Sequence, residues 1–221
     1  MIGETPTPTV SALAHQFDDL TQQNEADDLG MWLFLSTELM FFGGLFLAYT
    51  VYRRQDEATF AAASQELDLF WGTLNTAILL TSSLTVALAT HAAESRQRQQ
   101  LIGLLTATIG LGSLFVSIKF MEYHQKYVHG LMPLGGLPFH WDGPSPAHAA
   151  LFFDLYFLMT GVHALHMLIG LVILLVLLVK AIRGGLLGDH AAPVRVTGLY
   201  WHFVDVVWVF LFPMLYLIGA R

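Results

Sequence analysis

Five long apolar runs constrain the fold of this chain more than any other feature of its sequence. They cover approximately residues 31–52, 69–91, 101–121, 150–180 and 199–219. At a rise of about 1.5 Å per residue, each run is long enough as a helix to cross a hydrocarbon layer about 30 Å thick. Hydrophobic residues make up 55% of the chain and charged residues only 12%, outside the usual range of soluble domains. The sequence therefore predicts an all-α integral membrane protein, a bundle of five transmembrane helices.

The connections between these runs also carry information about the fold. Most are short, which favours an up-and-down bundle in which consecutive helices are neighbours. Residues 122–148 are the exception, because their glycines and prolines predict a folded surface loop. The run 150–180 is longer than a perpendicular crossing needs, so we expect this helix to tilt or to project beyond the bilayer.

An acidic leader precedes the membrane domain. We divide the chain into this leader, residues 1–29, which we expect to be partly disordered, and a five-helix membrane domain, residues 30–221. The leader holds six Asp or Glu and no Lys or Arg, so it is not a cleavable export signal. The spacing of Leu13, Phe17 and Leu20 predicts a short amphipathic helix within it. The net charge of -7 argues against nucleic acid as a partner.

Two further counts limit the function. The chain has no cysteine, which excludes thiolate zinc sites, iron–sulfur clusters and disulfides. An odd number of crossings places the two termini on opposite sides of the membrane. Lys and Arg are evenly shared between the two sides, so the positive-inside rule does not orient the chain.

Glu38 lies well inside the first apolar run. A carboxylate in hydrocarbon costs several kcal/mol unless it faces protein or water, so we expect Glu38 to be neutral or paired. We interpret it as a hydrogen-bonding group that joins neighbouring helices, and a role in handling protons is the alternative.

Four histidines suggest a metal site at first sight. His163 and His166 are three positions apart on the fourth run, and His91 and His202 lie near the ends of the second and fifth runs. A di-iron site would need clustered histidines and carboxylates at ligand spacing, and a haem would need axial histidines on facing helices. Neither pattern is present, so we expect a structural role and no metal or cofactor bound by this chain.

The fifth run contains a polar stripe. On a helix Trp201, Asp205 and Trp208 share one face, and His202 lies close enough to Asp205 to touch it. We interpret the stripe as a docking face or a polar network. On the second run, Asn75 predicts side-chain hydrogen bonds between packed helices.

The third run ends in charged residues. Glu122 follows Lys119 by three positions and precedes Lys126 by four, which predicts ion pairs on the helix surface. Gly44 and Ala48 on the first run, and Gly103, Gly110 and Gly112 on the third, predict close backbone approach. The sequence has no nucleotide-binding loop and no hydrolase nucleophile motif, so the residues alone favour a non-catalytic helical subunit or a small channel.

Five motifs, in this order and spacing, resemble subunit III of haem-copper terminal oxidases, the cytochrome c oxidase subunit III family. The motifs are Ser36-Thr-Glu-Leu-Met-Phe-Phe42, Leu74-Asn-Thr76, Glu122-Tyr123, Gly161-Val-His-Ala-Leu-His166 and Tyr200-Trp-His-Phe-Val-Asp-Val-Val-Trp208. The resemblance extends from Gly30 to Gly219, and the last motif is the most specific.

The resemblance implies a subunit without a redox centre, docked on the catalytic subunit I that holds the haems and copper. It implies contacts with other oxidase subunits, support of proton uptake, and tightly held phospholipid. It also implies a bacterial inner membrane location with the N-terminus cytoplasmic and the C-terminus outside. Within it, Glu38 matches the family's buried carboxylate, and His163, His166, His202 and Asp205 match its polar framework.

One departure separates this chain from the longer family members. These have seven spans, and this chain resembles the five-span forms, so we expect any bound lipid to be shared with a neighbouring subunit. Glu38 inclines the interpretation toward the cytochrome c type; a quinol oxidase or nitric oxide reductase complex is the alternative. A free-standing proton channel and a membrane metalloenzyme are the other hypotheses.

Overall fold

The computed structural model describes residues 16–133 and 139–219, which are helical throughout apart from turns and connections. The helices are α1 (Leu20–Gln55), α2 (Glu57–Gln65), α3 (Leu69–Glu94), α4 (Arg98–Val128), α5 (Pro146–Ile182) and α6 (Ala192–Tyr216), with a short 3-10 helix at Gly188–His190. Five of them, α1, α3, α4, α5 and α6, are long and apolar enough to cross a membrane. The five predicted spans are confirmed. The sequence did not predict the short helix α2, so the described residues form six α-helices, of which five are the predicted spans.

α1 begins earlier than the first apolar run. The Asp19 side chain accepts a hydrogen bond from the Gln22 backbone N–H at 2.7 Å, and this cap starts the helix at Leu20. With 36 residues the helix is about 54 Å long, more than a bilayer crossing requires. Of the predicted amphipathic helix, Leu13 lies outside the described residues, Phe17 is not helical, and Leu20 is the first residue of α1, so the prediction is wrong at Phe17.

Asp56 forms the corner between α1 and α2. Its carboxylate accepts hydrogen bonds from the backbone N–H of Thr59 at 3.1 Å and from the Thr59 hydroxyl at 2.7 Å, which caps α2. Phe60 of α2 then packs against Tyr49 of α1 and Phe152 of α5. The first connection is therefore a short helix folded back onto the bundle.

The predicted loop 122–148 is shorter than expected. α4 continues through Val128, and α5 already begins at Pro146. Residues 122–128 remain helical because Glu122 and Lys126 point into the protein, where they are 4% and 7% exposed. The described residues of this connection, 129–133 and 139–145, are irregular as predicted, but residues 122–128 are not.

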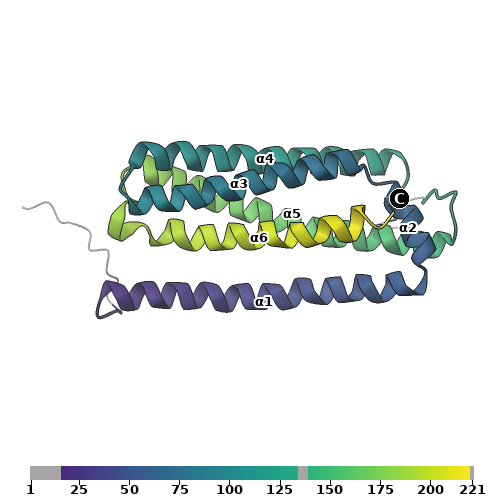
Figure 1. The fold of residues 1–221 in the computed structure, drawn as a ribbon, viewed down its shortest axis with the longest axis horizontal. Coiled ribbons are helices and arrows are strands. Elements are labelled where there is room, and N and C mark those ends of the chain that lie inside the picture. Colours follow the sequence, from purple (N-terminus) through teal and green to yellow (C-terminus); the bar gives the residue numbers. More distant parts are fainter. Residues whose placement is uncertain (1–15, 134–138, 220–221) are drawn as a thin grey trace, which may run out of the picture.

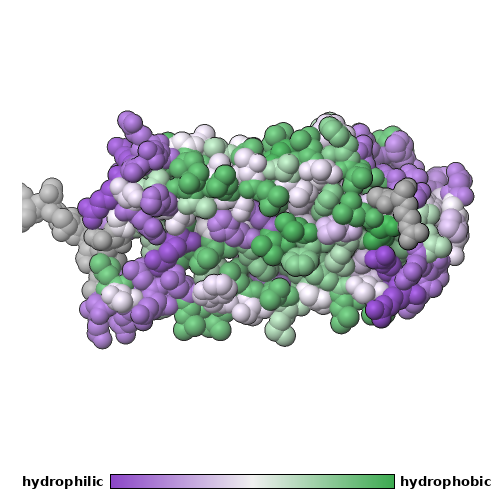
Figure 2. Space-filling model, in the orientation of Figure 1, coloured by the Kyte–Doolittle hydropathy of each residue, from purple (hydrophilic) through white to green (hydrophobic). Residues whose placement is uncertain are grey.

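Helices α3 to α6 form a closed four-helix bundle, and α1 lies beside it (Figure 1). Consecutive neighbours pack as predicted from α3 onward. α1 departs from that expectation, since it packs chiefly on α6 and α5. On the visible face hydrophobic residues occupy the middle, and hydrophilic residues gather at the two ends (Figure 2). This distribution is the one a membrane-spanning bundle requires.

Trp201 fills the centre of the bundle and sets how closely the helices approach. A Cβ added to Gly112 of α4 would lie 2.9 Å from the Trp201 ring, and one added to Gly170 of α5 would lie 2.8 Å from it. The predicted close approach is therefore right for Gly112. It is wrong for Gly44, Gly103 and Gly110, where a Cβ would meet nothing within 4 Å.

Candidate functional site

α1 meets the bundle along one narrow seam of residues spaced seven apart. Leu35, Phe42 and Tyr49 are the buried residues of this helix. Asp28 and Asp56 continue the same spacing at its two ends. A seven-residue spacing keeps side chains close to one face of a helix, as in coiled coils. The seam therefore has an apolar middle and a carboxylate at each end.

Polar contacts join this seam to α5 and α6. Arg195 binds Asp28 at 3.1 Å at one end, and His148 Nδ1 lies 2.9 Å from an Asp56 oxygen at the other. Between them, the Tyr49 hydroxyl donates to the Met214 carbonyl at 2.6 Å. Each of these contacts crosses from α1, or its corner, to another helix.

Glu38 makes a further contact, with His166. A Glu38 carboxylate oxygen lies 3.2 Å from His166 Nε2, and the side chains are 20% and 13% exposed. His166 Nδ1 donates to the Val162 carbonyl at 2.9 Å, which leaves Nε2 without a proton in a neutral ring. The hydrogen bond therefore needs one shared proton, on the acid or on the imidazole. The geometry fits the expectation that Glu38 is neutral or paired.

A groove runs along α1 and α6 beside this pair. Its volume is about 360 Å³. We define the α1–α6 groove by its lining residues, Trp32, Leu35, Ser36, Leu39, Phe42 and Phe46 of α1 and Leu199, His202, Phe203, Val206, Val207 and Phe210 of α6. The lining is almost wholly apolar, so the groove suits a hydrocarbon chain better than a polar molecule.

The tryptophan stripe of α6 points into the bundle. Trp201 Nε1 donates to the Ser82 hydroxyl at 3.1 Å, and Trp208 Nε1 donates to the Thr76 hydroxyl at 3.0 Å. Both rings are fully buried by the chain's own helices. The polar-network interpretation fits this geometry, and the alternative of a docking face for a partner is wrong for this stripe.

The predicted contact between His202 and Asp205 is not formed. His202 Nδ1 lies 2.7 Å from the Ser83 hydroxyl of α3, and both Asp205 carboxylate oxygens lack a hydrogen-bond partner among the described residues. Spacing on one helix placed the two side chains within reach of each other. The neighbouring helix α3 then offered His202 a partner on another side.

A cluster centred on Lys119 and Glu122 is the feature that sequence reasoning misplaced. The predicted ion pair exists, at 3.0 Å, but the two side chains are 4% exposed, so its assignment to the helix surface is wrong. Lys119 Nζ also donates to the hydroxyls of Tyr156 and Tyr216, at 3.0 and 2.8 Å. Both tyrosines donate to Glu122 Oε1, at 2.8 and 2.5 Å. This Lys119 cluster joins α4, α5 and α6.

Lys126 does not pair with Glu122 as predicted. It donates to the backbone carbonyl of Glu66, at the end of α2. The signal that could have located the Lys119 cluster is that Lys119 lies within the third apolar run, where a charge needs a buried partner. Tyr156 and Tyr216 belong to other runs, and no sequence spacing connects them to Lys119.

The remaining predicted residues do not converge on one site. His91 is exposed in the last turn of α3, with Nε2 3.5 Å from the Ser95 hydroxyl. Asn75 and His163 are buried, and their polar side-chain atoms have no hydrogen-bond partner in the described part of the chain. Within residues 16–133 and 139–219, no three His, Cys, Asp or Glu are grouped so that they could hold a metal ion.

Comparisons with known proteins agree with this picture. A family profile described as Cytochrome c oxidase subunit III matches residues 21–129 and 141–220. The chain is 30% identical to the cytochrome bo(3) ubiquinol oxidase subunit 3 of Pseudomonas aeruginosa, over 94% of this chain and 92% of that protein. It is 28% identical to probable quinol oxidase subunit 3 of Staphylococcus saprophyticus, over 93% and 96%, and of Staphylococcus aureus, over 91% and 94%.

Proposed function

Because this chain belongs to the cytochrome c oxidase subunit III family, we propose that it works as a non-catalytic accessory subunit of a haem-copper terminal oxidase in aerobic respiratory electron transport. The match of the family profile to residues 21–129 and 141–220 carries this proposal. The polar side chains support it, because Glu38, the Lys119 cluster and the tryptophan stripe mainly join helices to one another. Such an arrangement suits a subunit that stabilises a partner.

In this proposal the chemistry belongs to the partner. The catalytic subunit I holds the haems and copper, and this chain stabilises it and supports proton uptake together with the other oxidase subunits. The exposed apolar surface of the span helices faces lipid or those subunits. This chain then contributes geometry and shielding and does not react with oxygen.

We test the accessory role by purifying the complex in mild detergent through a tag on this chain. Haem absorption bands and a catalytic subunit should co-purify with it, and the isolated chain should contain no stoichiometric iron or copper. The isolated chain in vesicles should also be electrically silent. Proton conductance by the chain alone would contradict the proposal in favour of a channel, and ligated metal in favour of a metalloenzyme.

The electron donor is a separate question, because the donor site lies on other subunits. Glu38 inclined the sequence interpretation toward cytochrome c. The names of the Pseudomonas and Staphylococcus relatives favour a second candidate, a quinol oxidase. Oxygen uptake by the purified complex, with reduced cytochrome c or a reduced quinol as donor, distinguishes the two.

We place a phospholipid acyl chain in the α1–α6 groove, shared with a neighbouring subunit. The apolar lining and the position of the groove between a peripheral helix and the bundle support this assignment. Val206→Trp would fill the groove and should reduce the phospholipid that co-purifies with the complex. Leu165→Trp, an exposed position on α5, is the matched control and should not. Equal lipid content in the two variants would contradict the assignment.

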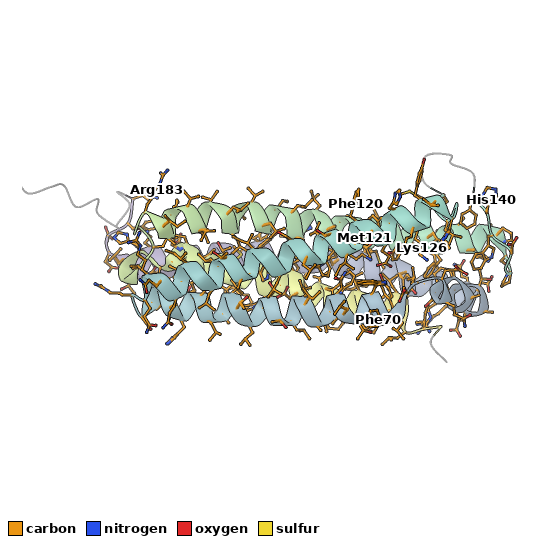
Figure 3. The ribbon with its side chains drawn as sticks, turned by 90° about the horizontal axis from the view of Figure 1, so that it is seen from above. Phe70, Phe120, Met121, Lys126, His140 and Arg183 are labelled. Carbon is orange, nitrogen blue, oxygen red and sulfur yellow. The ribbon has the colours of Figure 1, made fainter. Side chains whose placement is uncertain are left out.

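The chain is integral to the membrane, and we propose the bacterial inner membrane with the N-terminus in the cytoplasm and the C-terminus outside. His140 and Arg183 lie at opposite ends of the bundle, which defines two faces to distinguish (Figure 3). The absence of cysteine allows single cysteines to be introduced directly. In intact cells an impermeant maleimide should label Asp142→Cys and should not label Gln99→Cys. The reverse pattern would overturn the orientation.

A further inference from the structure

Three buried polar side chains of the bundle lack hydrogen-bond partners. They are Asn75 of α3, His163 of α5 and Asp205 of α6, and they are 0%, 1% and 3% exposed. Both amide atoms of Asn75, both ring nitrogens of His163 and both carboxylate oxygens of Asp205 are unpartnered among the described residues. Ser83 of α3 interacts with the Asp205 carboxylate and also lies 2.7 Å from His202 Nδ1, so a single hydroxyl serves both side chains.

The three side chains lie around Trp208, each within about one helical turn of Trp208 or of its hydrogen-bond partner Thr76. The His163 ring centroid is 5.2 Å from the Trp208 ring centroid. The indole N–H of Trp208 donates to Thr76, the residue that follows Asn75. Asp205 precedes Trp208 by one helical turn on α6. We call Asn75, His163 and Asp205 the Trp208 layer.

The neighbouring Lys119 cluster shows how buried polar groups of this bundle can be fully partnered. Lys119 Nζ lies 5.2 Å from the Trp208 ring, close to the Trp208 layer. It donates three hydrogen bonds, to Glu122, Tyr156 and Tyr216, which uses its full donor capacity. The unpartnered atoms of the Trp208 layer therefore call for a specific explanation, because buried polar groups in proteins are almost always hydrogen-bonded.

The chemistry of the layer identifies the class of ligand. Asp205 offers acceptors when ionised, Asn75 offers both a donor and an acceptor, and an imidazole offers one of each when neutral. A metal ion would leave the amide N–H₂ of Asn75 unpaired, and the described residues contain no group of three His, Cys, Asp or Glu that could hold one. A lipid chain would leave every one of these atoms unpaired. A water molecule both donates and accepts, and it binds at such sites inside proteins.

We propose that the Trp208 layer is an internal water site, with water molecules hydrogen-bonded to Asn75, His163 and Asp205 between α3, α5 and α6. The site lies within a single subunit and is separate from the α1–α6 groove. It does not depend on the accessory function, because the unpartnered atoms are a property of the bundle itself. Water here connects α3, α5 and α6 through these three side chains.

The first test is a single-particle structure of the intact complex in lipid nanodiscs, at a resolution that shows ordered water. Density peaks should lie about 2.6–3.2 Å from the Asp205 carboxylate and from at least one of the Asn75 and His163 polar atoms. The proposal is overturned if these atoms bond directly to protein groups, or if no peak accompanies them.

Variants add a control to this measurement. Asn75→Leu keeps a similar volume without polar atoms, so the peak beside position 75 should disappear while the peak at Asp205 remains. Thr108→Val is the matched control, because Thr108 is buried but already bonded to the Leu104 carbonyl and to Thr85. It should leave the peaks unchanged. An unchanged set of peaks in Asn75→Leu would count against the site.

A measurement on the unmodified chain keeps the proposal testable if Asn75→Leu does not assemble. Solid-state NMR of the ¹⁵N-histidine-labelled complex should show magnetisation transfer from water protons to the His163 ring. The signal is assigned by its loss in His163→Phe. Transfer confined to exposed histidines such as His91, with none to His163, would overturn the proposal.

Discussion

α1 and α6 run side by side, yet they are held in the molecule in different ways. α6 buries twelve of its 25 residues and inserts Trp201 and Trp208 among its neighbours. α1 buries three of its 36 residues along one seam and otherwise relies on polar contacts such as Glu38 with His166. Lipid is as apolar as a leucine side chain, so apolar burial alone does not attract helices in a membrane. The comparison teaches that interlocking shape secures α6, while directional polar contacts position α1.

The largest loss of stability should come from removing the buried charge of Lys119 in the bundle. Lys119→Met leaves Glu122 buried without its cation, and removing one partner of a buried ion pair costs about 3–5 kcal/mol. Thermal denaturation of the purified complex should show a large loss of stability. The double variant Lys119→Met with Glu122→Met should recover much of it, because no charge then remains unpaired. A single variant as stable as the original protein would contradict the buried pair.

Adding a methyl group next to Trp201 should cause the second largest loss of stability. Gly112→Ala places a methyl group 2.9 Å from Trp201 and 3.0 Å from Leu171, and overpacking of this kind costs about 1–3 kcal/mol. Gly103→Ala on the same helix meets nothing within 4 Å and serves as the control. The melting temperature should fall for the first variant and not for the second. Equal melting temperatures for the two variants would show that the helices around Trp201 are packed less closely than the structure indicates.

Removing the polar contact between α1 and the bundle should have a smaller effect than either of these changes. Glu38→Leu removes the hydrogen bond to His166, worth about 1 kcal/mol between membrane helices. A pair of spin labels on α1 and α4 should report a broader distance distribution. Ser36→Ala is the control, because Ser36 bonds the Trp32 carbonyl of its own helix. Glu38→Gln locates the shared proton: a neutral acid is well replaced by the amide, and a carboxylate is not.

The smallest effect on stability should come from Asp56, at the corner between α1 and α2 outside the membrane. Hydrogen bonds from the Thr59 side chain and backbone lower the pKa of the Asp56 carboxyl from 3.8 to about 2. Its stabilising contribution is therefore present above about pH 4 and is lost as the pH falls toward 2. Asp56→Asn should lower the melting temperature above pH 4, and the difference should shrink below it. Asp142→Asn, in the exposed loop, should show no such convergence.

The sequence anticipated the spans well because hydrophobic length is a local property. The first four apolar runs fall within α1, α3, α4 and α5, the fifth extends only three residues past the end of α6, and their number needed no tertiary information. It anticipated α2 and the end of α4 poorly, since both depend on distant contacts. Phe60 is buried against Phe152, and Lys126 reaches the carbonyl of Glu66. No local pattern contains these partners.

The sequence by itself determined that this chain crosses a membrane, that Glu38 needs a partner, and that its motifs are those of an oxidase subunit III. The tertiary structure decided which partners are used: His166 for Glu38, Ser83 for His202, and two tyrosines for the Lys119 cluster. The physical reason is that composition and spacing fix the cost of burying a polar group. Only the packing of helices that are distant in the chain determines which atom becomes the hydrogen-bond partner of each buried polar group.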